Sequence, residues 1–195
     1  MRKLTLLILA AGKGTRLKST LPKVLHQLAG KSLIEHVVEA ARPLRPSATC
    51  VVVGYEAGRV QNALAHLSFQ FAIQEPQLGT GHAVQVAGPF WKTNEGDLLV
   101  LSGDVPLIAT QTLQGLLDQH AQSGASATLL STKLEDPAGY GRVVRNNRGD
   151  VECIVEHKDA TDKERRISEI NTGIYCFAID DLAQIIDALS AQNSQ

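Results

Sequence analysis

The chain has 195 residues, with 19 lysines and arginines against 20 acidic residues, and a formal net charge of −1. This length fits one ordinary domain with a buried core, and a hydrophobic content of 44% argues against intrinsic disorder. The balanced charge creates no overall basic field, so we expect no nucleic-acid partner and only a local anion site. We also expect no membrane partner, because no apolar run approaches the length of a membrane span.

Apolar runs alternate with amphipathic helical stretches through about the first two thirds of the chain. The predicted strands cover residues 4–10, 49–53, 69–73, 97–101 and 127–131. The predicted helices cover residues 32–41, 59–67, 81–90 and 110–123, and in the first of them Leu33, Val37 and Ala40 are predicted to lie on one face. Strand–helix alternation predicts an α/β fold, with a mainly parallel sheet between helices in a three-layer, Rossmann-like arrangement. Its ligand crevice should lie beyond the carboxyl ends of the strands.

After about Asp136 the pattern changes to shorter β runs. Residues 141–144 and 151–155 flank a polar turn and therefore predict a β-hairpin. A charged loop at 157–168 precedes a predicted strand at 173–177, and residues 182–189 predict a terminal helix. We therefore expect a single domain with three parts, which are a core at 1–135, a β-rich part at 136–178 and a terminal helix at 179–195.

The most informative segment is the apolar run LLILAAGKGTRL, residues 6–17, which is followed by Pro22-Lys23. The run ends in a glycine-rich turn that carries three cations, Lys13, Arg16 and Lys18. Glycines let backbone N–H groups face an anion, and nearby cations hold phosphate oxygens. The turn therefore predicts a nucleotide phosphate site at the end of a buried strand. The alternative is an apolar strand followed by an ordinary basic loop.

Two well-known phosphate loops do not fit this segment. The dinucleotide-binding fingerprint needs a small residue at the position where this chain has Leu17. It also needs an acidic residue about 20 positions further on, at the end of a strand, but the acidic residues in that region, Glu35 and Glu39, lie in a predicted helix. A Walker A loop needs four residues between its glycines and then Lys-Ser or Lys-Thr, and neither Gly12 nor Gly14 begins that spacing. The remaining pattern resembles the signature of sugar-phosphate nucleotidyltransferases.

An acidic residue follows another predicted strand in Ser102-Gly103-Asp104-Val105-Pro106. Pro106 disfavours continuation of the strand, so Asp104 is expected to project into the crevice. A carboxylate there can hold Mg²⁺ against nucleotide phosphates. The alternative is that Asp104 only caps the turn before the helix near Thr110.

A second strand-end loop, QEPQLGTGHA at residues 74–83, runs into a predicted helix. Its glutamines and closely approaching glycines suit recognition of a flat base edge, because an amide offers both donor and acceptor. The alternative is a helix N-terminus with turn glycines and a threonine cap. We interpret His82 as structural.

Three polar segments of the β-rich part, 139–142, 155–159 and 169–173, supply a carboxylate, an amide and exposed backbone. Such groups suit sugar hydroxyls and an acetamido group, which need several directional hydrogen bonds. Each segment by itself is equally consistent with a hairpin turn, a solvated charge run or an Asx turn.

The cysteines and the N-terminal residues indicate in which cellular compartment the protein is expected. Cys50, Cys153 and Cys176 are odd in number and form no CxxC pair, which predicts reduced, buried thiols in a cytoplasmic protein. Met1-Arg2-Lys3 and the following apolar run imitate a short signal peptide. Cleavage would remove the strand that feeds the glycine-rich turn, so we interpret this segment as part of the fold.

Taken together, LILAAGKGTRL, LPKVLH, EPQLGTGHA, GDVPL, DPAGYGR, IVEHKDAT and EINTGIY resemble, in this order, the N-acetylglucosamine-1-phosphate uridylyltransferases. More specifically, they resemble the amino-terminal half of the bacterial bifunctional uridylyltransferase/acetyltransferases. The resemblance covers nearly the whole chain, and QLGTGHA with GYGR and VEHKDA is its most specific part. It implies a nucleotidyltransferase fold with a β-rich sugar-binding insertion, and a role in UDP-N-acetylglucosamine synthesis for peptidoglycan and lipopolysaccharide.

The resemblance also implies a role for individual residues. The implied nucleotide-binding residues are Leu9, Ala10, Ala11, Gly12, Lys13, Gly14, Gln74, Gln77, Gly79, Thr80, Ser102 and Gly103, of which Gln74, Gly79 and Thr80 read uracil. The implied catalytic residues are Arg16, which holds the triphosphate with Lys13, and Lys23, which neutralises phosphate charge. Asp104 is the implied Mg²⁺ ligand. The implied sugar-binding residues are Gly141, Glu156 and Asn171.

The implied partners are UTP, N-acetylglucosamine 1-phosphate, UDP-N-acetylglucosamine and pyrophosphate, with Mg²⁺ as cofactor. A phosphate oxygen of the sugar phosphate attacks the α-phosphorus of UTP in line and expels pyrophosphate, so positioning and charge neutralisation supply most of the catalysis. One alternative is a related nucleotidyltransferase for another base or sugar phosphate. Another is a truncated module that binds UTP without turnover.

The chain departs from the family in two respects. Ser102 stands where some relatives carry tyrosine. In addition, the family takes a second Mg²⁺ ligand, an asparagine, and its trimerising acetyltransferase β-helix from segments beyond residue 195. We therefore expect a truncated, monomeric form with weakened or absent uridylyl transfer and no acetyl transfer.

Overall fold

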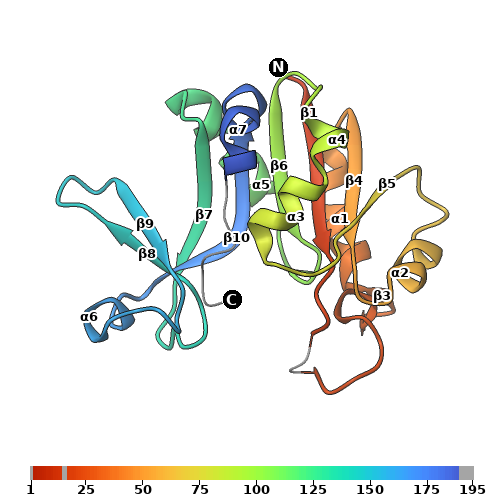
Figure 1. Cartoon of the computed structure of the whole chain (residues 1–195), viewed down its shortest axis with the longest axis horizontal. Coiled ribbons are helices and arrows are strands. Elements are labelled where there is room, and N and C mark those ends of the chain that lie inside the picture. Colours follow the sequence, from red (N-terminus) through yellow and green to blue (C-terminus); the bar gives the residue numbers. More distant parts are fainter. Residues whose placement is uncertain (1, 15–16, 189–195) are drawn as a thin grey trace. The chain divides into compact units, whose positions relative to one another are not determined.

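The computed structural model describes residues 2–14 and 17–188 (Figure 1). By its internal contacts the chain forms two compact units: the first runs to Thr128 and resumes at Tyr175, and the second covers Leu129–Ile174. The sequence places its divisions at 135/136 and 178/179 instead. Two long strands, β7 (Ala127–Lys133) and β10 (Glu169–Ala178), each contribute residues to both units.

The first unit is built on a sheet whose central strand is β1 (Leu4–Ala10) (Figure 1). β1 pairs in parallel with β4 (Ala48–Val53) and β6 (Asp97–Ser102), and β4 pairs in parallel with β5 (Gln70–Ile73). The last residues of β10 pair with β6 in antiparallel fashion. The predicted mainly parallel α/β sheet is therefore confirmed. The inner strands read as continuous apolar runs because parallel sheets are covered on both faces.

Helices cover this sheet on two sides (Figure 1). On one side lie α3 (Thr80–Val86), α4 (Gly88–Trp91) and α7 (Ile179–Ile185). Behind the sheet in this view lie α1 (Leu33–Ala41) and α5 (Thr110–Ser123), while α2 (Ala57–Ala63) follows β4. The shorter elements are β2 (Gln27–Leu28), β3 (Lys31–Ser32) and the 3₁₀ turns Lys23–Leu25, Arg42–Leu44 and Ile186–Ala188.

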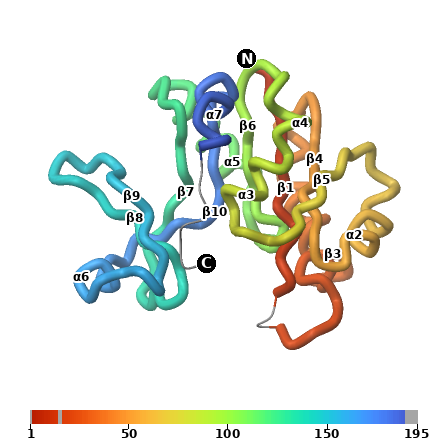
Figure 2. The backbone as a smooth tube through the Cα atoms, viewed as in Figure 1, coloured from red at the N-terminus to blue at the C-terminus, as the bar shows by residue number. Residues whose placement is uncertain are grey.

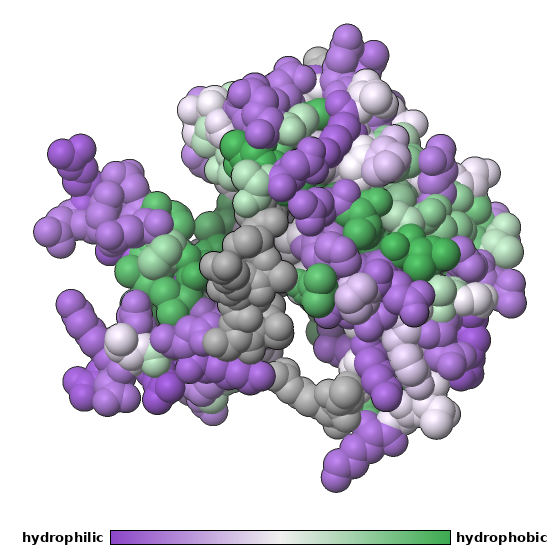
Figure 3. All heavy atoms as spheres, in the orientation of Figure 1, coloured by the Kyte–Doolittle hydropathy of each residue, from purple (hydrophilic) through white to green (hydrophobic). Residues whose placement is uncertain are grey.

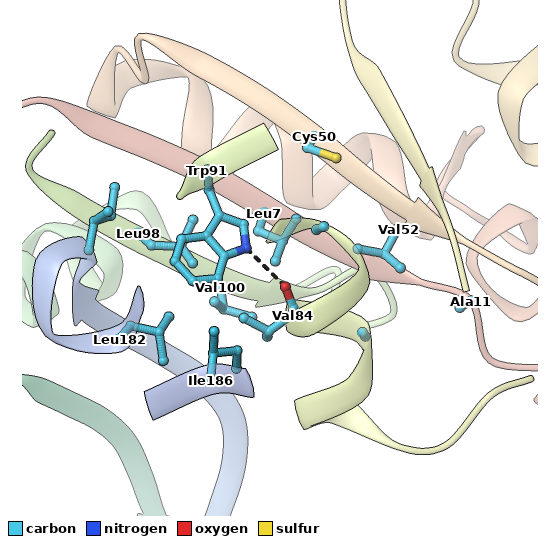
Figure 4. Close-up of a cluster of buried hydrophobic side chains, with 13 residues drawn as sticks. Leu7, Ala11, Cys50, Val52, Val84, Trp91, Leu98, Val100, Leu182 and Ile186 are labelled. Carbon is cyan, nitrogen blue, oxygen red and sulfur yellow. Dashed lines mark hydrogen bonds between the residues drawn. The ribbon is translucent and has the colours of Figure 1, made fainter. Parts of the chain in front are cut away.

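A buried cluster joins the sheet to α3, α4 and α7 (Figure 4). Trp91 is fully buried against Leu98, Val100 and Leu182, and its Nε1–H donates to the carbonyl of Val84 at 2.9 Å. A buried indole needs such a partner, because its N–H has lost water. The bond joins α4 to α3, and the apolar cluster packs both helices against the sheet.

The buried face of α1 differs from the prediction. The helix starts at a capping box in which Glu35 N–H donates to Ser32 Oγ, and Ser32 N–H donates to Glu35 Oε2 at 2.7 Å. Its buried residues are Ile34, Val37, Val38 and Ala41, whereas Leu33 and Ala40, on the predicted apolar face with Val37, are only half-buried. Both sets fit helical spacing, and only the position of the sheet decides between them.

Three further expectations are corrected. The predicted helix 81–90 is split at Ala87, because Pro89 has no N–H for a helix interior and instead occupies the first turn of α4. The charged loop 157–168 contains a short helix, α6 (Asp162–Arg165), started by a Thr161–Glu164 capping box. Cys50 and Cys176 are buried as expected, but Cys153 is exposed.

The second unit contains the predicted hairpin, formed by β8 (Arg142–Arg145) and β9 (Val151–Val155) (Figure 1). β8 also pairs with β10 through Arg142 and Ile170. The hairpin turn is closed by Asn146, whose N–H donates to the Asp150 carbonyl at 2.9 Å. The hairpin and its partner β10 therefore pair in antiparallel fashion, as part of the same sheet that contains β1, and the unit carries one helical turn.

The surface in Figure 3 is mainly hydrophilic, with hydrophobic side chains gathered in smaller areas. None of the helices in the described part of the chain has the length and apolar character that crossing a membrane requires.

Candidate functional site

The carboxyl ends of β1, β4 and β6 meet at one edge of the first unit's sheet, because the three strands are parallel neighbours. Two backbone hydrogen bonds continue this contact past the strands. Tyr55 N–H donates to the Ala11 carbonyl at 3.1 Å, and Gly103 N–H donates to the Leu9 carbonyl at 2.9 Å. The glycine-rich turn after β1 therefore lies between the segments that follow β4 and β6.

The glycine-rich turn begins directly after β1, which can be followed in Figure 2. Gly14 has φ +65°, and a Cβ added to it would lie 2.6 Å from Lys23 Cβ. Only glycine fits here, because the backbone is left-handed and the lysine stem fills the space. Arg16, the second predicted catalytic residue, lies outside the described residues. The Lys13 side chain is exposed, and its Nζ makes a cation–π contact with Tyr55, at 5.3 Å from the centroid of the ring.

Lys23 and Asp104 form an ion pair through Nζ and Oδ2. Their side chains are 41% and 28% exposed, so both groups remain accessible to a ligand. Asp104 does not cap α5 itself, since the N-cap of that helix is Ala109. Within the described ranges no three His, Cys, Asp or Glu side chains cluster as a metal site, so Asp104 is a single carboxylate beside the glycine-rich turn.

The loop after β5 is tied together by Gln74, whose side chain is almost fully buried. Its Nε2 donates to the Gly79 carbonyl at 2.9 Å and lies 3.2 Å from His82 Nδ1. The amide N–H groups of Gln74 therefore hold the loop itself, which agrees with a structural role for His82. The more accessible groups are Gln77 and Thr80, both exposed. The threonine-cap alternative is not observed, because Gly79 is the N-cap of α3.

Gly54 was not singled out from the sequence, although it directly follows β4. A Cβ added there would meet Gln77 Nε2 at 2.7 Å, the Gln74 carbonyl oxygen at 2.9 Å and Ala11 Cβ at 3.0 Å. Gly54 thus allows the loop after β5 to approach the loop after β1. A glycine directly after a predicted parallel strand was the available signal.

The three candidate sugar residues lie together in the second unit. Asn171 N–H donates to the Gly141 carbonyl at 2.9 Å. A Cβ added to Gly141 would lie 3.1 Å from Glu156 Oε1. Asn171 Oδ1 accepts a hydrogen bond from Gly173 N–H at 3.0 Å. A carboxylate, an amide and a buried glycine thus converge on one place.

The cysteines supply no reactive thiolate in the core. Burial raises the pKa of Cys50 to about 11 and that of Cys176 to about 12, so both stay protonated at neutral pH.

Comparisons with known proteins agree with these features. Residues 6–168 match the family model of the MobA-like NTP transferase domain. The chain is 50% identical over 193 residues to the bifunctional protein GlmU of Synechococcus sp. (strain CC9605), covering 98% of this chain and 43% of that protein. It is also 50% identical over 188 residues to the GlmU of Bacillus mycoides (strain KBAB4), covering 96% of this chain and 41% of the relative. The chain thus spans less than half the length of these relatives.

Solved structures share the fold. A putative glucose-1-phosphate thymidylyltransferase from Bacillus anthracis superposes with a TM-score of 0.76 at 21% identity, over 96% of this chain and 76% of that one. A UDP-glucose pyrophosphorylase solved with UDP-glucose gives 0.73 at 19% identity, over 96% and 80%. The resemblance inferred from the motifs is confirmed, and the chain belongs to the MobA-like NTP transferase domain family, with a nucleotidyltransferase fold.

Proposed function

We propose that the chain transfers UMP from UTP to N-acetylglucosamine 1-phosphate, giving UDP-N-acetylglucosamine and pyrophosphate. The observation that carries this proposal is the Lys23–Asp104 pair beside the left-handed glycine turn at the carboxyl edge of a parallel sheet. Such edges bind nucleotides in α/β folds. The motifs shared with bifunctional GlmU proteins favour uridine and N-acetylglucosamine over other nucleotides and sugars.

The first unit is proposed to bind UTP. The loops after β1, β5 and β6 would contact the nucleoside, and Lys13 and Arg16 would hold the triphosphate. Lys23 would neutralise charge as the sugar phosphate oxygen attacks the α-phosphorus, because both reactants are anions. Gly141, Glu156 and Asn171 of the second unit would hold the N-acetylglucosamine moiety.

Asp104 is the residue proposed to hold Mg²⁺. A single, partly exposed carboxylate fits this ion, because Mg²⁺ is usually bound by one or two carboxylates together with substrate phosphates. When bound, the ion would supply charge neutralisation on the phosphates of UTP and the leaving pyrophosphate.

The test is to incubate the protein with UTP, Mg²⁺ and N-acetylglucosamine 1-phosphate and to measure pyrophosphate. Parallel reactions replace UTP with other nucleoside triphosphates, or the sugar with glucose 1-phosphate. Pyrophosphate released with UTP and N-acetylglucosamine 1-phosphate above all other pairs supports the proposal. Preference for another pair would assign a different nucleotidyltransferase reaction, and binding of UTP without product would assign a binding module.

A further inference from the structure

Arg142, the first residue of β8, is buried to 1% exposure and has no role in the site described above. Arginine is seldom buried without a paired carboxylate. In the part of the chain that the structure describes, no acidic side chain forms an ion pair with Arg142, and its Nε has no hydrogen-bond partner. A buried cation without a counter-charge is costly, so its presence calls for an explanation.

The guanidinium instead contacts polar atoms from three segments. Nη1 donates to the carbonyl of Tyr140, and Nη2 lies 3.3 Å from His157 Nδ1 and 3.5 Å from the Arg165 carbonyl oxygen. These atoms belong to the loop before β8, the turn after β9 and the last residue of α6. One side chain thus ties together three segments that are separate in the sequence.

Arg142 also stands next to every candidate sugar residue. Gly141 directly precedes it in the chain. Its cross-strand partner on β9 is Val155, which precedes Glu156, and its partner on β10 is Ile170, which precedes Asn171. The backbone pairing of Arg142 therefore brings the three candidates together, and its guanidinium contacts Tyr140 and His157, the chain neighbours of Gly141 and Glu156.

Stability alone does not account for this arrangement, because an apolar side chain of similar volume in place of a buried charge is often neutral or stabilising. The planar fork of arginine, in contrast, can hold several acceptors in fixed directions. We propose that Arg142 is the positioning residue of the sugar subsite. It holds Gly141, Glu156 and Asn171 in the arrangement that binds the N-acetylglucosamine moiety, without touching the ligand. This assignment rests on the proposed function.

The experiment compares Arg142→Met, which keeps length but removes charge and donors, with Arg142→Lys, which keeps the charge but loses the fork. The matched control is Arg145→Met, on the same strand with the same charge change, because Arg145 binds Glu169 and the Gly149 carbonyl and not the loop before β8 or the turn after β9. Calorimetric titration measures the affinity for UDP and for UDP-N-acetylglucosamine. The affinity for UDP-N-acetylglucosamine divided by the affinity for UDP reports the contribution of the sugar to binding.

In Arg142→Met this ratio should fall about 10–100-fold, as expected when hydrogen bonds from a charged group are lost, while the affinity for UDP stays unchanged. Arg142→Lys should recover part of the ratio, and Arg145→Met should keep the wild-type ratio even if it lowers the melting temperature. Circular dichroism checks that each variant is folded. If Arg142→Met does not fold, His157→Leu removes a single acceptor and should lower the ratio about 2–10-fold.

An unchanged ratio in folded Arg142→Met, or in His157→Leu if the former is unfolded, would overturn the positioning role. An equal loss in Arg145→Met would also overturn it, because the effect would then be general destabilisation of the second unit. If the wild-type protein binds UDP-N-acetylglucosamine no more tightly than UDP, the sugar subsite does not exist, and the proposed function fails together with this assignment.

Discussion

Lys23 forms an ion pair with Asp104, although 81 positions separate them in the sequence (104 − 23). The turn that carries Lys23 follows the glycine-rich segment after β1, and Asp104 follows β6. In the proposed reaction the two side chains have different partners, phosphate for the lysine and Mg²⁺ for the aspartate. Without substrates, each neutralises the other.

Lys23→Met should therefore reduce turnover strongly while leaving the protein folded. A charge-assisted hydrogen bond to a phosphate is worth roughly 1.5–3 kcal/mol, which corresponds to about a 10–100-fold loss. A partly exposed ion pair adds only about 0–1 kcal/mol to stability, so the melting temperature should change little. Pyrophosphate release and thermal unfolding measure the two effects. Lys31→Met, which breaks an exposed pair with Glu39, is the control and should keep full turnover.

Gly14→Ala should weaken UTP binding as well as stability. The new Cβ would lie 2.6 Å from Lys23 Cβ, so the lysine stem or the turn must move. Gly124→Ala is a matched control, because Gly124 has φ +60° but no atom within 4 Å of an added Cβ. Both variants should lose about 1–2 kcal/mol of unfolding free energy to backbone strain. Only Gly14→Ala should lower UTP affinity by titration calorimetry, and equal affinities in the two variants would contradict the proposed role of the turn.

His120 should make the protein less stable in mild acid. The residue is fully buried at 1% exposure, and burial lowers its pKa below the ordinary value of 6.5, although nearby Asp97 opposes the shift. Between the lowered pKa and 6.5, the unfolded state binds the proton and the folded state does not, so unfolding free energy falls as pH drops through this range. Urea unfolding between pH 7.5 and pH 5 measures the effect.

The variant His120→Gln should show a weaker dependence of unfolding free energy on pH. A slope that is the same in His120→Gln and in the wild type would show that other groups cause the acid sensitivity.

Glu169 should stabilise the second unit above about pH 4.5 and lose this effect in acid. Hydrogen bonds from Arg145, at 2.7 and 2.9 Å, and from Ser131, at 2.6 Å, lower its pKa to about 2. Since the folded-state pKa is depressed, the stabilisation is present above the unfolded value and disappears as pH falls toward 2. Glu169→Gln should lower the unfolding free energy by about 1 kcal/mol at pH 7, because solvent around the partly exposed Arg145 weakens the ion pair.

The comparison for Glu169→Gln is Glu152→Gln, at an exposed position on β9. Chemical denaturation at pH 7 and pH 3 should show a difference between the two variants at pH 7 that shrinks at pH 3. Equal stability of the two variants at pH 7 would remove the proposed contribution of the Glu169 hydrogen bonds.

The order of the main strands and helices, and with it the α/β class, follows from the sequence alone. Mainly apolar runs such as 4–10 and 97–101 are decided locally, because a strand that is covered on both faces is built largely from apolar residues. The glycine-rich turn was equally predictable, because the requirement for glycine in a left-handed turn is a property of the backbone.

The tertiary structure decided what each polar side chain faces. Three features depend on segments that meet only after folding: which face of α1 is buried, the hydrogen bond of the Gln74 amide within its own loop, and the close approach of the loops after β1 and β5 at Gly54. The same holds for the ion pair of Lys23 with Asp104 and for the buried guanidinium of Arg142. Sequence patterns record local conformation and average burial, whereas a contact between distant residues is set by the packing of the whole sheet.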